Sequence, residues 1–275
     1  MRDKRTSLEA AIAAVPDGAR LALGGNTLHR GPGAAVHELV RQGRRGLEIV
    51  KTAGAYDIDL LCGVGAAATV SAGFVGFETA FGLAPSYRRA VEGGRVEARE
   101  HACYTVIAGL RAAIQGVPFM PVAGLTGSDL PAARGFRRLG DPYGGGEVVV
   151  IPALVPDVAI VHVQEADAIG NARIVGTRFE DVLMVQAARR VILTAERIVD
   201  GAGFEAAPET VAIAGFMVDA VVEAPGGAWP FGCAGLYDFD TEYLAAYVAA
   251  SRAEETLLRF VRERILDDAA AMVLA

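Results

Sequence analysis

The chain alternates between short apolar runs and stretches in which apolar residues recur every three to four positions. The runs predict strands, and the last three of them are β-branched in the manner of strands buried on both faces of a parallel sheet. The predicted strands cover residues 19–25, 47–53, 69–76, 147–154, 157–163 and 189–196. The predicted helices cover residues 8–15, 34–43, 104–116, 179–190 and, as one or two helices, 240–265. This order predicts an α/β fold with a mostly parallel sheet flanked by helices.

Local signals refine the ends of these elements. Thr6 and Glu9 have the spacing of a capping box and predict the start of the first helix. Gly63 and Gly65 resemble part of a dinucleotide fingerprint, but the run before them is not a clear strand. We therefore interpret these two glycines as helix-end residues.

The least regular segment is 124–147, which is rich in Gly, Pro and charged residues. It predicts a long loop, and a loop of that length in a compact chain is often functional. Neither a domain boundary nor an internal repeat is visible. We expect a single domain over residues 1–275, with a helical extension over about 240–275.

The composition is globular and acidic, with 52% hydrophobic residues, 21% charged residues and a formal net charge of −7. An acidic chain is a poor partner for nucleic acid or an anionic membrane, and no apolar stretch is long enough to span a bilayer. Cys62, Cys103 and Cys233 are too widely spaced for a disulfide framework or a zinc site. We expect a cytoplasmic protein with free thiols, no metal, and no nucleic-acid or membrane partner.

The most distinctive segment is LALGGNTLHRGPG, residues 21–33. Its apolar run ends at Gly24 and Gly25, which lack a Cβ and let the backbone approach a ligand. Free N–H groups at this point could stabilise a developing oxyanion. Polar residues that could position a carboxylate or a thioester follow: Asn26, Thr27, His29 and Arg30. A tight turn between a strand and a helix would explain the glycines equally well.

The spacing of Asp17-Gly18, Leu21-Ala22-Leu23, Gly24-Gly25 and Pro32 resembles the glycine motif of family I coenzyme A transferases. Asn26 stands where that family usually has Phe, and Arg30 where it usually has Gly. An Arg before the Pro is typical of the branch that contains the A subunit of glutaconate CoA-transferase. The branch also resembles the chain at DLLCGVGA, VGFE, LAPSYRRAVEGGRVEARE, IAGLRAAIQGVPFMP, GLTGSDL, PALVPDVAIVHVQEADAIGNARI and VDAVVEAPGGAWP, in which Trp229 replaces a common His.

This resemblance covers most of residues 1–230 and implies the NagB/RpiA-like fold of the family. It also implies transfer of CoA from an acyl thioester to a carboxylate. In the family, a glutamate within a Ser-Glu-x-Gly-type motif attacks the thioester and passes through an anhydride to a glutamyl-CoA thioester. This chain has no Ser-Glu pair, and in two-subunit members that glutamate belongs to the B subunit.

The resemblance therefore implies an A subunit without a catalytic residue of its own, in an A2B2 heterotetramer with a B subunit that supplies the glutamate. Its substrates would be an acyl-CoA and a carboxylic acid, and it would hold no permanently bound cofactor. The candidate oxyanion and substrate-binding residues are Gly24, Gly25, Asn26, Arg30, Gly127, Ser128 and Gln164.

A pocket lined by Asn26, Arg30 and Gln164 would suit a carboxylate, including the second carboxylate of a dicarboxylic acid, because Arg binds carboxylates bidentately. Arg30 would be structural instead if it paired with an acid such as Glu78 or Asp57. The candidate nucleophiles within this chain are Glu78 and Glu165. Each of these two is also explained by an ion pair or a helix cap.

Two alternatives stay open. Some similar A subunits hydrolyse a carbon–carbon bond of a cyclic-ketone CoA thioester and carry an additional acidic residue after the segment EARE, where this chain has Ala102 and Cys103. The transferase fold is also related to sugar-phosphate isomerases and to the effector-binding domains of regulators. A non-catalytic small-ligand-binding domain is therefore the second alternative, although the acidic chain shows no helix-turn-helix segment.

Overall fold

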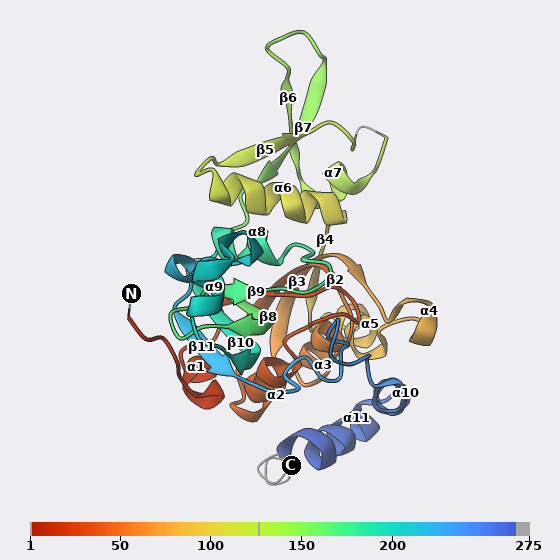
Figure 1. Cartoon of the computed structure of the whole chain (residues 1–275). Helices are drawn as coiled ribbons and strands as arrows, with labels where there is room; N and C mark the ends of the chain where they lie inside the picture. The colour runs from red at the N-terminus through yellow and green to blue at the C-terminus, as the bar shows by residue number, and fades with distance from the viewer. Residues whose placement is uncertain (1, 126, 268–275) are drawn as a thin grey trace.

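The computed structural model describes residues 2–125 and 127–267 and is built around one large parallel sheet (Figure 1). The strand order is β11-β10-β8-β1-β2-β3-β4, and all neighbours in this order pair in parallel. The strands are β1 Arg20–Leu23, β2 Leu47–Gly54, β3 Ala67–Val75, β4 Glu97–Glu100, β8 Val158–Ala166, β10 Arg190–Ile198 and β11 Ala220–Glu223. The short strand β9, Ala172–Arg173, adds to β8 in the antiparallel direction. The predicted mostly parallel sheet is confirmed.

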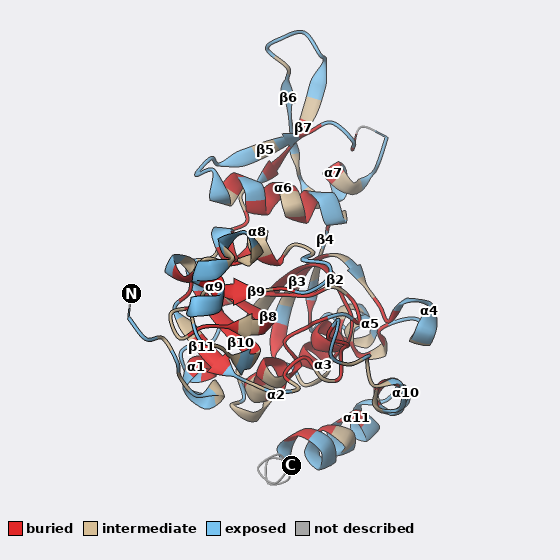
Figure 2. Ribbon diagram, in the orientation of Figure 1, coloured by how far each residue is buried: buried red, intermediate tan, exposed pale blue. Residues whose placement is uncertain are grey.

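Helices cover both faces of this sheet, so its central strands β1, β2 and β8 are buried on both sides, whereas the edge strand β4 is polar. Leu21 and Leu23 of β1 join the core cluster beneath one group of helices, whereas Ala22 joins the cluster on the other face. The first group comprises α1 Leu8–Ala13, α2 Gly33–Arg41, α3 Tyr56–Gly63, α5 Pro85–Glu92, α10 Thr241–Ala250 and α11 Glu254–Val261. The second comprises α6 Cys103–Ile114 and α8 Asp181–Ala187. Figure 2 shows the central strands buried between these two layers.

A second, three-stranded antiparallel sheet projects from the body beyond α6 (Figure 1). Its strands are β5 Phe119–Val122, β6 Arg137–Gly140 and β7 Glu147–Pro152, and α7 Leu130–Arg134 packs against it. The prediction that residues 147–154 join the parallel sheet is therefore wrong. The predicted loop over 124–147 is also wrong, because it contains α7 and β6. All four residues of β6 are exposed, so this strand carries no apolar alternation that the sequence could reveal.

The ends of several helices lie at or next to the capping and glycine signals in the sequence. The N-cap of α1 is Ser7 rather than Thr6, and its hydroxyl accepts the N–H of Ala10 at 3.1 Å. Gly63 is the last residue of α3, which confirms the interpretation of a helix end. The predicted C-terminal helices are present, with a turn of π-helix over Arg262–Leu266; residues 268–275 of the predicted extension lie outside the described residues. Each helix within 2–125 and 127–267 is too short or too polar to cross a membrane.

The remaining short elements are α4 Glu78–Phe81, α9 Ala202–Ala206 and the 3-10 turns Pro208–Thr210 and Gly215–Met217.

The strand order of the large sheet reverses at β1, and this place is important for function. From β1 the chain proceeds to β2, β3 and β4 on one side, whereas β8, β10 and β11 build the other side. The carboxyl ends of β1 and β8 therefore flank a switch point, which is where open α/β sheets bind ligands.

Candidate active site

The glycine-rich segment leaves β1 at this switch point and folds into a tight turn. Asn26 N–H donates to the His29 carbonyl at 2.9 Å, and His29 N–H donates back to the Asn26 carbonyl at 2.8 Å. Gly25 has a φ of +73°, and a Cβ there would lie 2.4 Å from the carbonyl oxygen of His29. Only glycine fits this position without distortion. The turn that the sequence left as an alternative is therefore present, and we call residues 24–32 the glycine loop.

The two glycine N–H groups of this loop already have partners. Gly24 N–H donates to the carbonyl of Ile160 in β8 at 2.9 Å. Gly25 N–H donates to Asp181 Oδ1 at 2.7 Å. The expectation of free N–H donors at these positions is wrong, because β8 runs beside β1 and the start of α8 brings a carboxylate to the turn.

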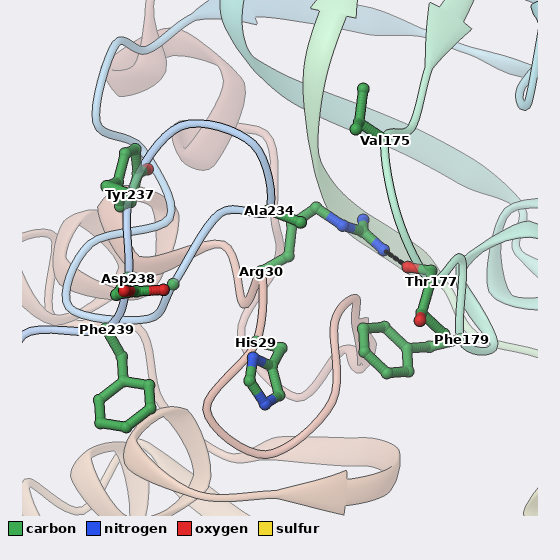
Figure 3. Close-up of a pocket in the computed structure, with 10 residues that line it drawn as sticks. His29, Arg30, Val175, Thr177, Phe179, Ala234, Tyr237, Asp238 and Phe239 are labelled. Atoms are coloured by element: carbon green, nitrogen blue, oxygen red, sulfur yellow. Dashed lines mark hydrogen bonds between the residues drawn. The ribbon is translucent and has the colours of Figure 1, made fainter.

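Arg30 forms a buried ion pair with Asp181, with 2.5 Å between Nη2 and Oδ2. Its Nη1 donates to the carbonyl of His162 at 2.8 Å, and Nη2 also donates to the carbonyl of Thr177 at 2.9 Å (Figure 3). Arg30 is 2% exposed, so its charge is neutralised within the protein. The structural role that the sequence left open is present, but the paired acid is Asp181 rather than Glu78 or Asp57. A substrate carboxylate on Arg30 stays a prediction that this pairing disfavours.

A second buried ion pair supports the same loop from beneath. Lys51 Nζ lies 2.5 Å from Asp57 Oδ2 and donates to the Gly24 carbonyl at 2.8 Å. Both side chains are fully buried. Because Asp57 also accepts the backbone N–H groups of Ala55 and Ile58, its carboxylate is fixed at the start of α3. The glycine loop therefore rests on two ion pairs that hold its backbone in one conformation.

A line of polar side chains crosses the switch point beside the loop. Asn26 Nδ2 donates to Thr52 Oγ1 at 3.4 Å, and the Thr52 hydroxyl donates to Glu180 Oε2 at 2.6 Å. The exposed Cys103 lies next to this line, since its thiol donates to the Thr52 carbonyl at 3.4 Å. Partial burial and the nearby Glu180 raise the pKa of this thiol. Thr52 and Glu180 are not among the residues predicted from the sequence, because no local pattern marks either of them.

A cavity of about 420 Å³ opens next to the glycine loop (Figure 3). His29 and Arg30 form one wall, and Tyr237, Asp238 and Phe239 form another. Val175, Thr177, Phe179, Gly232 and Ala234 complete the lining. The His29 ring lies between two phenyl rings, with centroids 6.5 Å from Phe179 and 6.4 Å from Phe239. The cavity thus offers an aromatic wall at the carboxyl end of the sheet.

The other candidate residues lie in different settings. The Gln164 side chain is buried, and its amide nitrogen donates to the carbonyls of Val175 and Ala234, each at 3.1 Å. Gly127 and Ser128 are exposed on the turn before α7, in the projecting unit, where the Ser128 hydroxyl accepts the N–H of Leu130 at 3.1 Å. The side chains of Gln164 and Ser128 thus form hydrogen bonds within the protein, and their substrate-binding roles stay predictions.

Neither internal glutamate is poised as a nucleophile. Glu165 accepts hydrogen bonds from Arg173 and Arg197. Burial alone would raise the pKa of Glu165, but the two guanidinium groups hold it below its usual range. Glu78 accepts a hydrogen bond from the Thr27 hydroxyl of the glycine loop. The ion-pair explanation is confirmed for Glu165, and Glu78 acts as a support for the loop.

His162, Glu196 and Cys233 have ligand atoms that all lie within 4.8 Å of one another, which is close enough for a metal ion. Hydrogen bonds already connect this group, however. His162 Nε2 lies 2.8 Å from Glu196 Oε1, which also accepts the Tyr237 hydroxyl, while Gly226 N–H donates to Glu196 Oε2 at 2.7 Å. Burial lowers the pKa of His162 and favours its neutral form. These hydrogen bonds connect residues 225–239 to β8 and β10. The absence of a metal stays a prediction.

Sequence comparisons place the chain among known proteins. The family described as coenzyme A transferase matches residues 5–224. The A subunit of glutaconate CoA-transferase of Acidaminococcus fermentans is 34% identical over 96% of this chain and 88% of its own. The IpdA subunit of the cholesterol ring-cleaving hydrolase of Mycobacterium tuberculosis is also 34% identical, over 95% and 92%. An uncharacterized protein of Archaeoglobus fulgidus is 38% identical over 93% of this chain, which spans 58% of that protein's length.

Solved structures agree with these sequence matches. The crystal structure of glutaconate coenzyme A-transferase from Acidaminococcus fermentans gives a TM-score of 0.92 at 33% identity, covering 96% of this chain and 89% of that one. A variant of the decarboxylase AibA/AibB gives a TM-score of 0.85 at 37% identity, covering 94% and 99%. Both matches cover more than nine-tenths of this chain. The chain belongs to the coenzyme A transferase family.

Proposed function

We propose that this chain is the A subunit of a two-subunit CoA transferase that moves CoA between an acyl-CoA and a carboxylic acid. The observation that carries the proposal is an active-site scaffold without a nucleophile. The glycine loop is rigidly built at the switch point, yet the chain has no Ser-Glu pair, and Glu78 and Glu165 are both engaged in supporting contacts. A partner glutamate would complete this site.

Within that site, Asn26 supplies an amide at the end of β1, and the aromatic cavity beside His29 receives part of the acyl group. Gly25 and Arg30 act as supports, because both are committed to Asp181. CoA enters as the thioester substrate and no cofactor is held permanently. We further propose an A2B2 assembly in the cytoplasm, in line with relatives that are named A subunits.

The test is reconstitution with a B-type subunit from the same genome that contains a Ser-Glu-x-Gly motif. We expect the purified chain alone to show no CoA exchange, and the co-purified complex to transfer CoA to free carboxylic acids. Sodium borohydride should trap the enzyme-bound CoA thioester on the B subunit only. Robust transfer by this chain alone would contradict the proposal.

Ring-opening hydrolysis of a CoA thioester is the alternative, because the IpdA relative is as similar in sequence as the glutaconate enzyme. Cys103 stands in the segment where such hydrolases carry an additional acid, and a thiol with a raised pKa is a poor substitute for a carboxylate. Incubation of the complex with acyl-CoA but no acceptor acid separates the two functions. A transferase needs the acceptor, whereas a hydrolase does not. A ligand-binding domain would do neither.

A further inference from the structure

Thr52 is the middle member of the polar line between Glu180 and Asn26. It lies in β2 and is 1% exposed, so water does not compete for its hydroxyl. The hydroxyl has one hydrogen to donate, and Glu180 Oε2 receives it at 2.6 Å. Thr52 Oγ1 can therefore act only as an acceptor toward Asn26. This fixes which end of the amide faces Thr52.

The Asn26 amide must present Nδ2 to Thr52, as the 3.4 Å contact shows, because its oxygen would meet an oxygen with no hydrogen left. One Nδ2 hydrogen is used in this way. Within the described part of the chain, no protein acceptor takes the second hydrogen, and Asn26 is half-buried at the carboxyl end of β1. The amide is thus held as a hydrogen-bond donor toward the switch point.

We propose that Glu180 and Thr52 are positioning residues that orient the Asn26 amide as the donor to the oxyanion of the CoA-transfer reaction. The inference rests on the proposed function. When the carboxylate of the partner's glutamate adds to the thioester carbonyl, the carbonyl electron pair moves to oxygen. The Asn26 N–H donates to that oxygen, and collapse of the adduct expels CoA as the thiolate and leaves the anhydride.

Two independent elements meet in this arrangement. Thr52 comes from β2, and Glu180 comes 128 residues later, directly before α8. The neighbouring Asp181 fixes Gly25 N–H, so consecutive carboxylates set both the backbone and the side chain of the loop. A donor that is held before the reaction needs no reorganisation in the transition state, which is the basis of oxyanion stabilisation.

Kinetics of the assembled complex test the proposal. Removing one oxyanion donor costs about 10²–10³-fold in kcat, so Asn26→Ala should lose that much. Thr52→Val should lose about tenfold or more, with KM for acyl-CoA changed less than threefold and an unchanged Tm. Thr52→Ser, which keeps the hydroxyl, should have a kcat close to that of wild type. Glu180→Ala frees the Thr52 hydroxyl to donate to the amide oxygen and should resemble Thr52→Val.

Thr105→Val is the matched control, since Thr105 is a buried threonine of α6 whose hydroxyl donates to the Ala102 carbonyl, outside the polar line of Asn26, Thr52 and Glu180. It should change Tm rather than kcat. Combining Asn26→Ala with Thr52→Val should add no further loss, because the second change acts through the first. Additive losses, or wild-type kcat in Thr52→Val or Asn26→Ala, would overturn the proposal.

An NMR measurement of hydrogen exchange, which does not depend on enzyme activity, tests this inference separately from the proposed function. In the chain itself, one of the two Asn26 Nδ2 hydrogens should be protected from exchange with solvent, and Thr52→Val should abolish that protection. Protection that persists in Thr52→Val overturns the orientation even if the complex transfers CoA. A complex that transfers no CoA contradicts the proposed function whatever the NMR result.

Discussion

Asp181 binds Arg30 and Gly25 at the same time, one with each carboxylate oxygen. Oδ2 lies 2.5 Å from the guanidinium of Arg30, and Oδ1 accepts the N–H of Gly25 at 2.7 Å. A single buried carboxylate therefore fixes both ends of the glycine loop. Arg30, which from the sequence suits a substrate carboxylate, has its charge neutralised inside the protein instead.

Replacing Arg30 should destabilise the protein before it affects substrate choice. Arg30→Met leaves Asp181 as an unpaired charge that is fully buried, and breaking a buried pair in this way costs about 3–5 kcal/mol. Urea unfolding should show this loss. The double variant Arg30→Met with Asp181→Asn keeps an acceptor for Gly25 N–H and should recover part of it.

A ligand role for Arg30 predicts the opposite pattern. In that case Arg30→Met would keep the wild-type Tm, and KM would rise for the acid but not for the acyl-CoA. Measuring Tm and both half-reactions on the same complex distinguishes the two roles.

Gly25 should tolerate no side chain, because a Cβ there would lie 2.4 Å from the carbonyl oxygen of His29. Gly65 is the matched control, because its φ of +75° is almost the same but a Cβ at that position would meet no atom within 4 Å. Gly65→Ala should cost about 1–2 kcal/mol from the left-handed backbone alone. Gly25→Ala adds a collision with the His29 carbonyl and should cost about 2–5 kcal/mol. If urea unfolding gave equal losses of stability in the two variants, the glycine loop would accommodate a Cβ at Gly25 without additional cost.

Asp59 should make stability depend on pH. Burial raises the pKa of Asp59 from 3.8 to about 6, although Tyr87 N–H and the Tyr247 hydroxyl each donate to it at 2.8 Å. The folded protein therefore holds this proton more tightly than the unfolded chain. The resulting stability is complete below about pH 4 and is lost as the pH rises through about 6.

The variant Asp59→Asn removes this titration. Its free energy of unfolding relative to wild type should rise by about 2–3 kcal/mol between pH 4 and pH 7, which is most of the value that corresponds to the full shift in pKa. Denaturant unfolding at the two pH values measures the change. A gap between variant and wild type that stays constant would show that Asp59 keeps an ordinary pKa.

Alkylation should single out Cys103 in the native chain. Cys103 is exposed, whereas Cys62 and Cys233 are buried. Iodoacetamide should add one group per native chain and three groups per chain in urea, as counted by mass spectrometry. Because the pKa of the Cys103 thiol is raised, the native rate should increase as the pH rises from 7 to 9. Labelling of a native Cys103→Ser variant would contradict the assignment.

Local sequence was enough to predict the elements that depend on neighbouring residues. Apolar runs defined most strands of the parallel sheet, because a strand buried on both faces needs apolar residues at every position. The paired glycines marked the tight turn after β1, since the φ of +73° at Gly25 is open to few other residues. The missing Ser-Glu pair, together with the family resemblance, indicated a site that lacks its nucleophile.

Only the folded structure shows which groups of that site are already held in hydrogen bonds or ion pairs. Asp181 lies 151 residues after Arg30, and Glu180 lies 128 residues after Thr52. Strand order brings these pairs together at the switch point, and no local pattern encodes strand order. The exposed strand β6 escaped detection because it packs neither face against a core. Secondary structure follows local periodicity, whereas hydrogen-bond occupancy and charge pairing depend on which distant segments become neighbours.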